Sequence, residues 1–235
     1  GSRGARLLKP YADAPGNKGL WVTSRQTMDE VCQRAYETGF QVAVHAIGDA
    51  ANRRVLDMYS NYLKPGNDRR WRIEHAQIVH PEDVQRFGKL QVVPSVQTTH
   101  ATSDMYWADE RLGNKRLQHA YAYKELLQQN EWLPNGSDFP VEEINPLFGF
   151  YAAVARKDQE GHPSGGFQKE NALTRKQALR AMTIWAAKAS FAEDKRGSLE
   201  PGKAADFVVL EKDLMKAPEQ ELFGLEVKQT WINGK

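Results

Sequence analysis

The chain has 235 residues, of which 40% are hydrophobic and 26% are charged, as in a globular protein that can bury a core. Its 32 Lys and Arg residues against 30 Asp and Glu leave a formal net charge of +2, which favours neither nucleic acid nor an anionic membrane as a partner. The longest apolar run, residues 147–155, is about half of the ~18 residues that a membrane-spanning helix needs.

Residues 27–39 carry the pattern of a helix that packs on one face. Thr27 and Glu30 match a capping box, and Gly39 can end the helix. The single cysteine, Cys32, lies inside this helix, so it is expected to be a small core residue rather than a catalytic thiol. One cysteine excludes an internal disulfide and predicts a reducing, cytoplasmic location.

Strands and helices alternate through the middle of the chain. Such alternation predicts βαβ units and a parallel sheet, whose function lies at the carboxyl ends of the strands. The expected strands are residues 40–46, 71–75, 91–96 and 131–136. The expected helices are residues 49–63, a helix opened by Pro81 and residues 119–129, with 98–118 as a long loop containing a short helix.

The last third of the chain changes character. Residues 144–158 and 174–193 are expected to be helical, with a loop at 159–172 and a second capping box from Thr174 to Gln177. After residue 193 two alternating runs, "ADFVVL" and "LEVKQTWINGK", predict strands without helices. Asn233-Gly234 is a strong hairpin turn. We therefore expect a first domain at 1–193 and a small separate sheet at 194–235.

Three of the expected strands end in side chains that can bind a metal. His45 ends the first strand, His75 the second and Asp138 the fourth. One such histidine is more often structural, but three at the same edge of one sheet favour a metal site. Asp49, four residues after His45, is expected to be the N-cap of the following helix rather than a ligand.

Five motifs in order along the chain resemble one known family. They are "VHAIGDAANRRVLD", "RIEHAQIVHPEDVQRF", "GSDFPVEEINPLFGFYAAVAR", "LTRKQALRAMTIWAAKAS" and "GSLEPGKAADFVVLEKD". Together they resemble the amidohydrolase superfamily, and within it the branch of YtcJ-like and N-substituted formamide deformylase-like metal-dependent hydrolases. Each motif alone is weak, whereas the combination is specific.

The resemblance implies an α/β fold, part of a (β/α)₈ barrel of the TIM type with part of a small β-sandwich. The four expected strands then correspond to barrel strands five to eight within residues 1–193, and residues 194–235 to the sandwich. His45, His75 and Asp138 match the family's metal ligands after strands five, six and eight. The ion implied is divalent, with Zn²⁺ expected.

The family's remaining ligands have no counterpart in this sequence. Its H-x-H pair and its bridging lysine belong to the first half of the barrel, and no two of the other four histidines are separated by a single residue; these are His80, His100, His119 and His162. The chain thus resembles the carboxyl-terminal half of the enzyme. Because a half-barrel exposes sheet edges, we expect either self-association or an amino-terminal half supplied by another polypeptide.

The reaction implied is hydrolysis of a non-peptide C–N bond in a small amide, formamide or cyclic amide. Asp138 would act as general base and then as general acid. Four residues near strand ends or an adjacent helix are expected to line the substrate pocket: Gln77, Gln97, His100 and Arg156. The alternative is a catalytically silent fragment with a structural or associative role.

Overall fold

The computed structural model describes residues 2–235 and has an α/β fold with a parallel sheet. Its elements are α1 (Arg25–Thr38), β1 (Ala43–Ala46), α2 (Asp49–Tyr62), β2 (Arg72–His75), α3 (Pro81–Leu90), β3 (Val93–Ser95), α4 (Thr99–Asp104), α5 (Ala108–Leu112), α6 (Asn114–Leu117), α7 (Tyr123–Asn130), α8 (Pro146–Ala155), η1 (Lys169–Asn171), α9 (Arg175–Met182), α10 (Ile184–Ala189), β4 (Phe207–Leu210), η2 (Glu219–Glu221) and β5 (Val227–Trp231).

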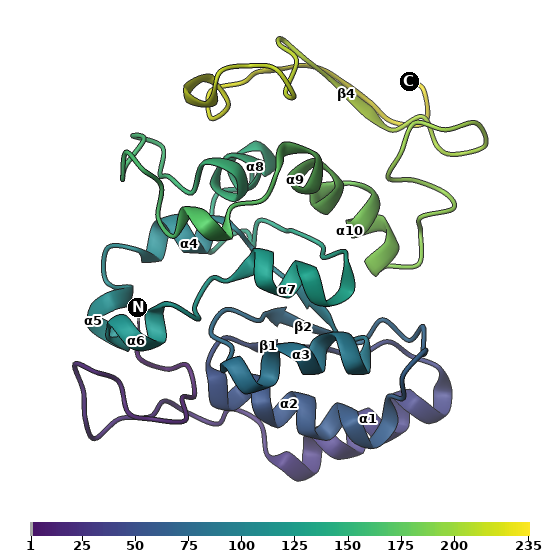
Figure 1. The fold of residues 1–235 in the computed structure, drawn as a ribbon. Coiled ribbons are helices and arrows are strands. Elements are labelled where there is room, and N and C mark those ends of the chain that lie inside the picture. The colour runs from purple at the N-terminus through teal and green to yellow at the C-terminus, as the bar shows by residue number, and fades with distance from the viewer. Residues whose placement is uncertain (1) are drawn as a thin grey trace. The chain divides into compact units, whose positions relative to one another are not determined.

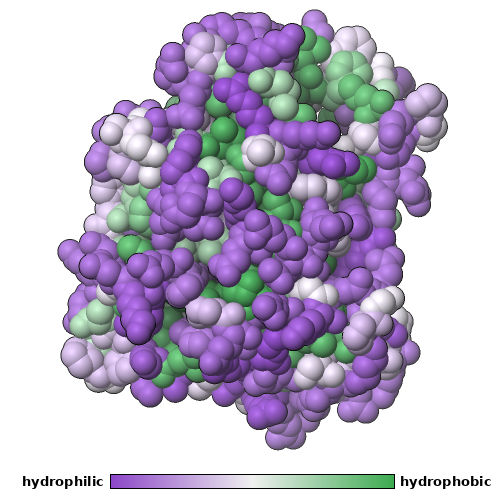
Figure 2. Space-filling model, in the orientation of Figure 1, coloured by the Kyte–Doolittle hydropathy of each residue, from purple (hydrophilic) through white to green (hydrophobic). Residues whose placement is uncertain are grey.

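These elements belong to two compact units. The first unit holds residues 2–96 and 104–131, and the second holds residues 97–103 and 132–235. In the part of the chain that the structure describes, no helix combines the length and the apolar character needed to cross a lipid bilayer. Figure 2 shows a largely hydrophilic face with hydrophobic residues between the polar ones, in keeping with the composition.

The parallel sheet of the first unit has the strand order β1-β2-β3. Parallel neighbours need a crossover connection, which α2 and α3 supply. Figure 1 shows α1 and α2 side by side next to these strands. Large buried side chains form the core between the helices and the sheet: Leu56, Tyr59, Trp71, Ile73 and Phe87.

Cys32 belongs to the same core, as the sequence predicts. It is 1% exposed, and burial raises the pKa of its thiol to about 11, with a smaller contribution from Asp29. The thiol therefore stays protonated near neutral pH, where a catalytic cysteine would need a thiolate.

A buried asparagine on α2 ties the carboxyl ends of the first two strands together. The Nδ2 group of Asn52, which is fully buried, donates to the carbonyl oxygens of Ala46 and Gly48 at 3.0 Å each. It also lies 3.2 Å from the carbonyl oxygen of Ile78, three residues beyond β2. One amide thus satisfies carbonyls from two chain segments that leave the sheet at the same edge.

Several expected helix termini are confirmed. Gly39 ends α1 in the left-handed conformation, with φ of 79°, and Pro81 occupies the first turn of α3. The capping box of Thr174 and Gln177 is present at the start of α9. The start of α1 was predicted wrongly, because the hydroxyl of Ser24, rather than that of Thr27, caps the helix.

Three expected elements differ from the structure. Residues 131–136 form no strand; Pro134 in this stretch lacks the N–H that a central strand would donate. The expected loop 98–118 contains three short helices, α4, α5 and α6, instead of one. The expected helix 174–193 is divided at Thr183, whose φ and ψ of −124° and −98° end α9 before α10 begins.

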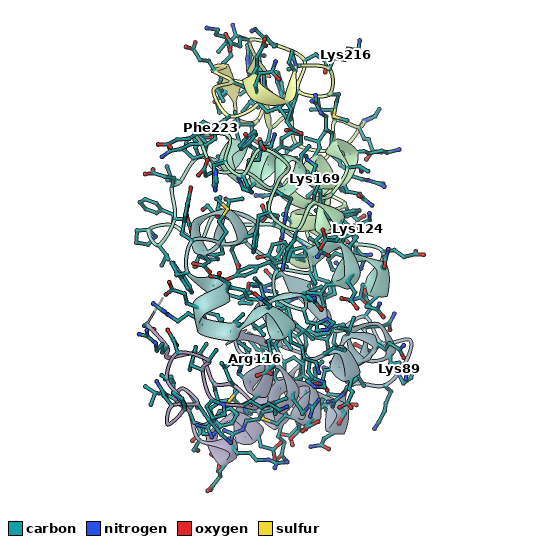
Figure 3. All side chains as sticks on the ribbon, turned by 60° about the vertical axis from the view of Figure 1, so that its left-hand side comes forward. Lys89, Arg116, Lys124, Lys169, Lys216 and Phe223 are labelled. Carbon is teal, nitrogen blue, oxygen red and sulfur yellow. The ribbon has the colours of Figure 1, made fainter. Side chains whose placement is uncertain are left out.

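The second unit packs its helices against the tail of the chain. The ring of Phe223, labelled in Figure 3, stacks on Phe148 of α8 with ring centroids 4.2 Å apart. Lys169, also labelled there, pairs with Glu219 at 3.3 Å. The two expected tail strands are confirmed as the antiparallel pair β4 and β5, and Asn233 has the positive φ that the predicted turn requires. The domain boundary at residue 193 stays a prediction.

Replacing Asn52 by alanine should destabilise the first unit strongly. The change leaves buried carbonyls of two segments without a donor, which costs about 2–4 kcal/mol in the free energy of unfolding. Urea unfolding monitored by tryptophan fluorescence measures this loss. The exposed Asn114→Ala, at the start of α6, is the control and should change stability by less than about 0.5 kcal/mol. Equal effects of the two substitutions would contradict the role given to Asn52.

Candidate metal centre

Two imidazoles meet at the carboxyl ends of adjacent strands in the first unit. His45 lies on β1 and His75 ends β2, with ring centroids 4.4 Å apart and the rings nearly perpendicular. His75 is 6% exposed, whereas His45 is exposed. The structure thus brings together the two histidines that the sequence predicts as ligands.

The contact between the two rings depends on an unusual backbone conformation. In the strand register His45 is opposite Glu74, while His75 is opposite Ala46. Regular alternation would therefore turn the two imidazoles to opposite faces of the sheet. The φ of His75 is +74°, in the left-handed region, and that of Ala76 is +45°. This departure from the extended conformation ends the alternation at the residue whose ring adjoins His45.

In the second unit, His100 lies between two carboxylates. Its Nε2 atom is 3.0 Å from Oδ2 of Asp138, and its Nδ1 atom is 3.0 Å from Oε1 of Glu142. The hydroxyl of Ser103 donates to the same Glu142 oxygen at 2.5 Å. Because an ionised carboxylate only accepts hydrogen bonds, both ring nitrogens donate when both carboxylates are charged. The imidazole then fixes the orientation of the Asp138 carboxylate.

The electrostatics of Glu142 follow from these contacts. Burial by itself would raise the pKa of its carboxyl group, but the hydrogen bonds from His100 and Ser103 and the charge of His100 outweigh burial and lower the pKa below 4.5. Glu142 is therefore an anion at neutral pH. The Glu142 oxygen therefore accepts the hydrogen bond from Nδ1 of His100.

A buried asparagine aligns the two segments that carry Asp138 and His100. The side chain of Asn135 accepts from the backbone N–H of Thr98 and donates to the hydroxyl of Thr98, both at 3.0 Å. That hydroxyl in turn donates to the carbonyl of Gly149 at 2.6 Å. Asn135 precedes Asp138 by three residues and Thr98 precedes His100 by two, so this pairing sets the approach of carboxylate and imidazole.

Asp138 shares the left-handed backbone of His75. Its φ is +63°, a conformation that non-glycine residues rarely adopt. Such strain persists only where surrounding contacts hold it, and it concentrates at functional sites. Two of the three predicted ligands, His75 and Asp138, have this backbone conformation.

The other predicted site residues are placed as follows. The amide of Gln77 is buried and donates to the carboxylate of Asp104 at 2.9 Å. Gln97 is buried, and its carbonyl accepts from the backbone N–H of His100. Arg156 is fully buried and donates to the carbonyl of Phe167 at 2.9 Å, which ties α8 to the loop 159–172.

Asp49 does not cap α2. The N-cap is Gly48, and Asp49 is the first helical residue. Its carboxylate accepts from the backbone N–H of Leu8 at 2.8 Å, so it holds the amino-terminal segment against the start of the helix.

Sequence reasoning missed four residues that shape these groups: Asn52, Ser103, Asn135 and Glu142. An asparagine inside the apolar pattern of a helix, as in α2, is a signal for a buried hydrogen-bonding role. Glu142 gives no comparable signal. It stands beside Glu143, between Val141 and Ile144, and only folding brings it to His100.

A parallel α/β sheet with two imidazoles at adjoining strand ends defines this protein as a candidate metal-binding protein of the α/β class. The chain belongs to the amidohydrolase family, whose sequence model matches residues 1–235. The family resemblance of the five motifs is therefore confirmed.

Three comparisons describe the relationship in more detail. The chain is 34% identical over 235 residues to YtcJ of Bacillus subtilis (strain 168), which is named as an amidohydrolase, and 29% identical over 216 residues to N-substituted formamide deformylase of Arthrobacter pascens. These matches cover 100% and 90% of this chain. A solved structure of an uncharacterized metal-dependent hydrolase from Pyrococcus horikoshii OT3 matches with a TM-score of 0.82 and 35% identity over 93% of this chain.

The chain spans about two fifths of the length of these relatives. It covers 44% of YtcJ, 39% of the deformylase and 43% of the solved hydrolase chain. More than half of each relative therefore lies outside the matched region.

Glu142→Gln should remove a pH-dependent part of the stability. Because folding lowers the pKa of Glu142, its contribution is complete above pH 4.5, the ordinary pKa of a glutamate, and is lost as the pH falls through the folded value. Urea unfolding should show the wild-type chain more stable than the variant at pH 6.5, with the difference shrinking at pH 3.5. Glu143→Gln is the control and should change the stability little at either pH. If E142Q lost the same amount of stability at pH 6.5 and at pH 3.5, the lowered pKa of Glu142 would not be its cause.

Proposed function

We propose that this chain provides metal-binding and catalytic residues of a metal-dependent hydrolase that cleaves non-peptide C–N bonds in small molecules. The observation that carries the proposal is the pair of adjoining imidazoles, His45 and His75, at the ends of parallel strands. Membership of the amidohydrolase family supports hydrolysis. The name of the Arthrobacter relative, N-substituted formamide deformylase, supports formamides as a substrate class. Linear and cyclic amides belong to the proposal because they contain the same kind of non-peptide C–N bond.

The proposed ligands of the metal are His45, His75 and Asp138. Two imidazole nitrogens and one carboxylate oxygen form a donor set that suits Zn²⁺, and a catalytic zinc site uses three protein ligands. A bound cation of this kind polarises a substrate carbonyl and lowers the pKa of water to near ~7. The left-handed backbone at His75 and Asp138 supports a functional role for both residues.

The carboxylate of Asp138 is the proposed proton carrier. It would accept the proton of the attacking water and return it to the departing nitrogen, as a general base and then a general acid. His100, 3.0 Å from Oδ2, would hold that carboxylate in one orientation. Gln77, Gln97 and His100 are proposed to line the substrate pocket, and Arg156 to support it through the loop 159–172.

The proposal extends to the surrounding fold and to the location. We propose that β1, β2 and β3 are consecutive strands of a (β/α)₈ barrel and that residues 194–235 belong to a β-sandwich. The TM-score of 0.82 with a metal-dependent hydrolase supports this architecture. The free, buried thiol of Cys32 supports a reducing compartment such as the cytoplasm.

Metal content tests the proposed centre directly. Protein purified without chelator or metal resin should retain about one divalent ion per chain by plasma mass spectrometry, with Zn²⁺ preferred. His45→Ala and His75→Ala should each reduce retention at least about tenfold. His162→Ala, which removes an imidazole from the loop 159–172, is the control and should retain the ion. Loss in all three variants, or in none, would overturn the ligand assignment.

Hydrolysis tests the role of Asp138. A panel of an N-alkylformamide, a linear amide and a cyclic amide is followed by amine release, with the metal supplied. Asp138→Asn should lower the rate at least about 100-fold, because the amide cannot take up the proton. Asp109→Asn in α5 is the control. Undiminished turnover by D138N would exclude the proton carrier. A wild-type chain that hydrolyses none of the three substrates would favour the alternative, a catalytically silent fragment.

A further inference from the structure

The side-chain amide of Gln77 is held by two other side chains of the first unit. Its Nε2 atom donates to Oδ2 of Asp104 at 2.9 Å and lies 3.2 Å from the hydroxyl oxygen of Tyr121. That hydroxyl donates to the same Asp104 oxygen at 2.9 Å. Burial and the charge of Asp104 raise the pKa of Tyr121, so its hydroxyl stays protonated and keeps donating. We call these three side chains the Gln77 cluster.

The Gln77 cluster decides which end of the amide faces Asp104. An ionised carboxylate only accepts hydrogen bonds, so it attracts the amide nitrogen and repels the amide oxygen. The backbone holds the same residues together, because the carbonyl of Gln77 accepts from the backbone N–H of Tyr121 at 2.7 Å. Nitrogen and oxygen occupy different corners of the planar amide, so Oε1 of Gln77 points away from Asp104.

This amide oxygen has no donor in the protein. Gln77 is 6% exposed, and within residues 2–235 no group donates to its Oε1 atom. A buried carbonyl oxygen without a donor costs free energy. The unpaired Oδ1 atom of Asn52 is fully enclosed, whereas Oε1 of Gln77 keeps some accessible surface. A small molecule can therefore reach Oε1 and supply the hydrogen bond.

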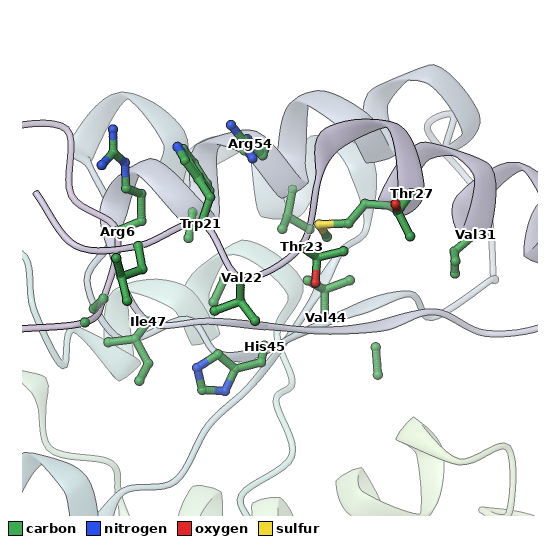
Figure 4. Close-up of a pocket in the computed structure, with 18 of the residues that line it drawn as sticks. Arg6, Trp21, Val22, Thr23, Thr27, Val31, Val44, His45, Ile47 and Arg54 are labelled. Carbon is green, nitrogen blue, oxygen red and sulfur yellow. The ribbon is translucent and has the colours of Figure 1, made fainter. Parts of the chain in front are cut away.

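The position of Gln77 links it to the candidate metal ligands. It follows His75 by two residues, and the ring of His75 meets that of His45. Figure 4 shows the His45 imidazole projecting from the β1 ribbon. Directly after Gln77, the backbone N–H of Ile78 donates to the carbonyl of Ile47 at 2.9 Å, so the segments that follow β1 and β2 stay paired. Gln77 and both histidines thus belong to the same edge of the sheet.

We propose that Oε1 of Gln77 accepts a hydrogen bond from the N–H of the substrate, so that the site selects amides and formamides whose nitrogen keeps one hydrogen. The inference rests on the proposed function, because it takes the hydrolysed amide to bind beside the histidines. A fully substituted nitrogen would leave Oε1 unpaired. A site that pairs its buried polar groups with the substrate strongly rejects analogues that lack the donor. Gln77 is then a specificity-determining residue, and Asp104 is a positioning residue.

Two ligands of nearly equal shape test the hydrogen bond. N-benzylacetamide contains the N–H, and 4-phenylbutan-2-one has a CH₂ group in its place. Ligand-observed NMR titration of the full 235-residue chain with Zn²⁺ supplied should show at least about tenfold tighter binding of the amide. Gln77→Met keeps the length of the side chain without the acceptor and should abolish this preference. Gln128→Met, at an exposed position of α7, is the matched control and should keep it.

Asp104→Asn tests the positioning of the Gln77 amide. An asparagine at this position can donate as well as accept, so it allows the oxygen of Gln77 to turn toward it. The preference for N-benzylacetamide should fall at least about threefold. A purely structural role would weaken the binding of both ligands equally and leave the preference unchanged, which would contradict the positioning role.

Three further results would overturn the inference. Equal affinity of the wild-type chain for the two ligands would exclude the hydrogen bond and leave the proposed hydrolysis standing. A preference that Q77M retains would assign the N–H to another acceptor. Binding of neither ligand with Zn²⁺ supplied would contradict the proposed substrate pocket itself, so the two failures are distinguishable. The wild-type comparison needs no substitution, and melting curves of Q77M and D104N separate lost selectivity from lost folding.

Discussion

The hydrogen bonds of the Asn52 amide hold together the two chain segments that carry the candidate ligand histidines. Ala46, one of its acceptors, directly follows His45, and Ile78, another, follows His75 by three residues. The amide is fully buried in the folded chain, so losing these bonds would leave buried carbonyls unpaired, which is costly. A single side chain on α2 therefore holds the ends of two parallel strands at the spacing that lets their imidazoles meet.

In the second unit a buried amide again holds two chain segments together. The amide of Asn135 holds Thr98 through two bonds of 3.0 Å, and these two residues lie just before Asp138 and His100. In both units a buried amide fixes the backbone, and the backbone then presents a side chain that can bind or transfer a proton. Such support limits the movement of the functional groups, which is a requirement of metal and catalytic sites.

The local parts of the fold were predictable because the information lies within a few residues. Pro81 starts a helix because its ring suits the first turn and its missing N–H costs nothing there. Gly39 ends α1 because it takes a positive φ without strain. The expected strand at 131–136 was wrong because its apolar residues match the strand pattern, while Pro134 reduces its capacity to join a ladder.

The sequence by itself determined the family, the order of the main elements and the histidines that end adjacent strands. These follow from short motifs and from the periodic spacing of hydrophobic residues, and both can be read directly from the sequence. Only the tertiary structure decided that the left-handed backbone of His75 brings its ring to His45, since regular alternation predicts opposite faces. It also decided that His100 binds both Asp138 and Glu142, because 38 and 42 residues separate these partners and no local pattern encodes a contact over that distance.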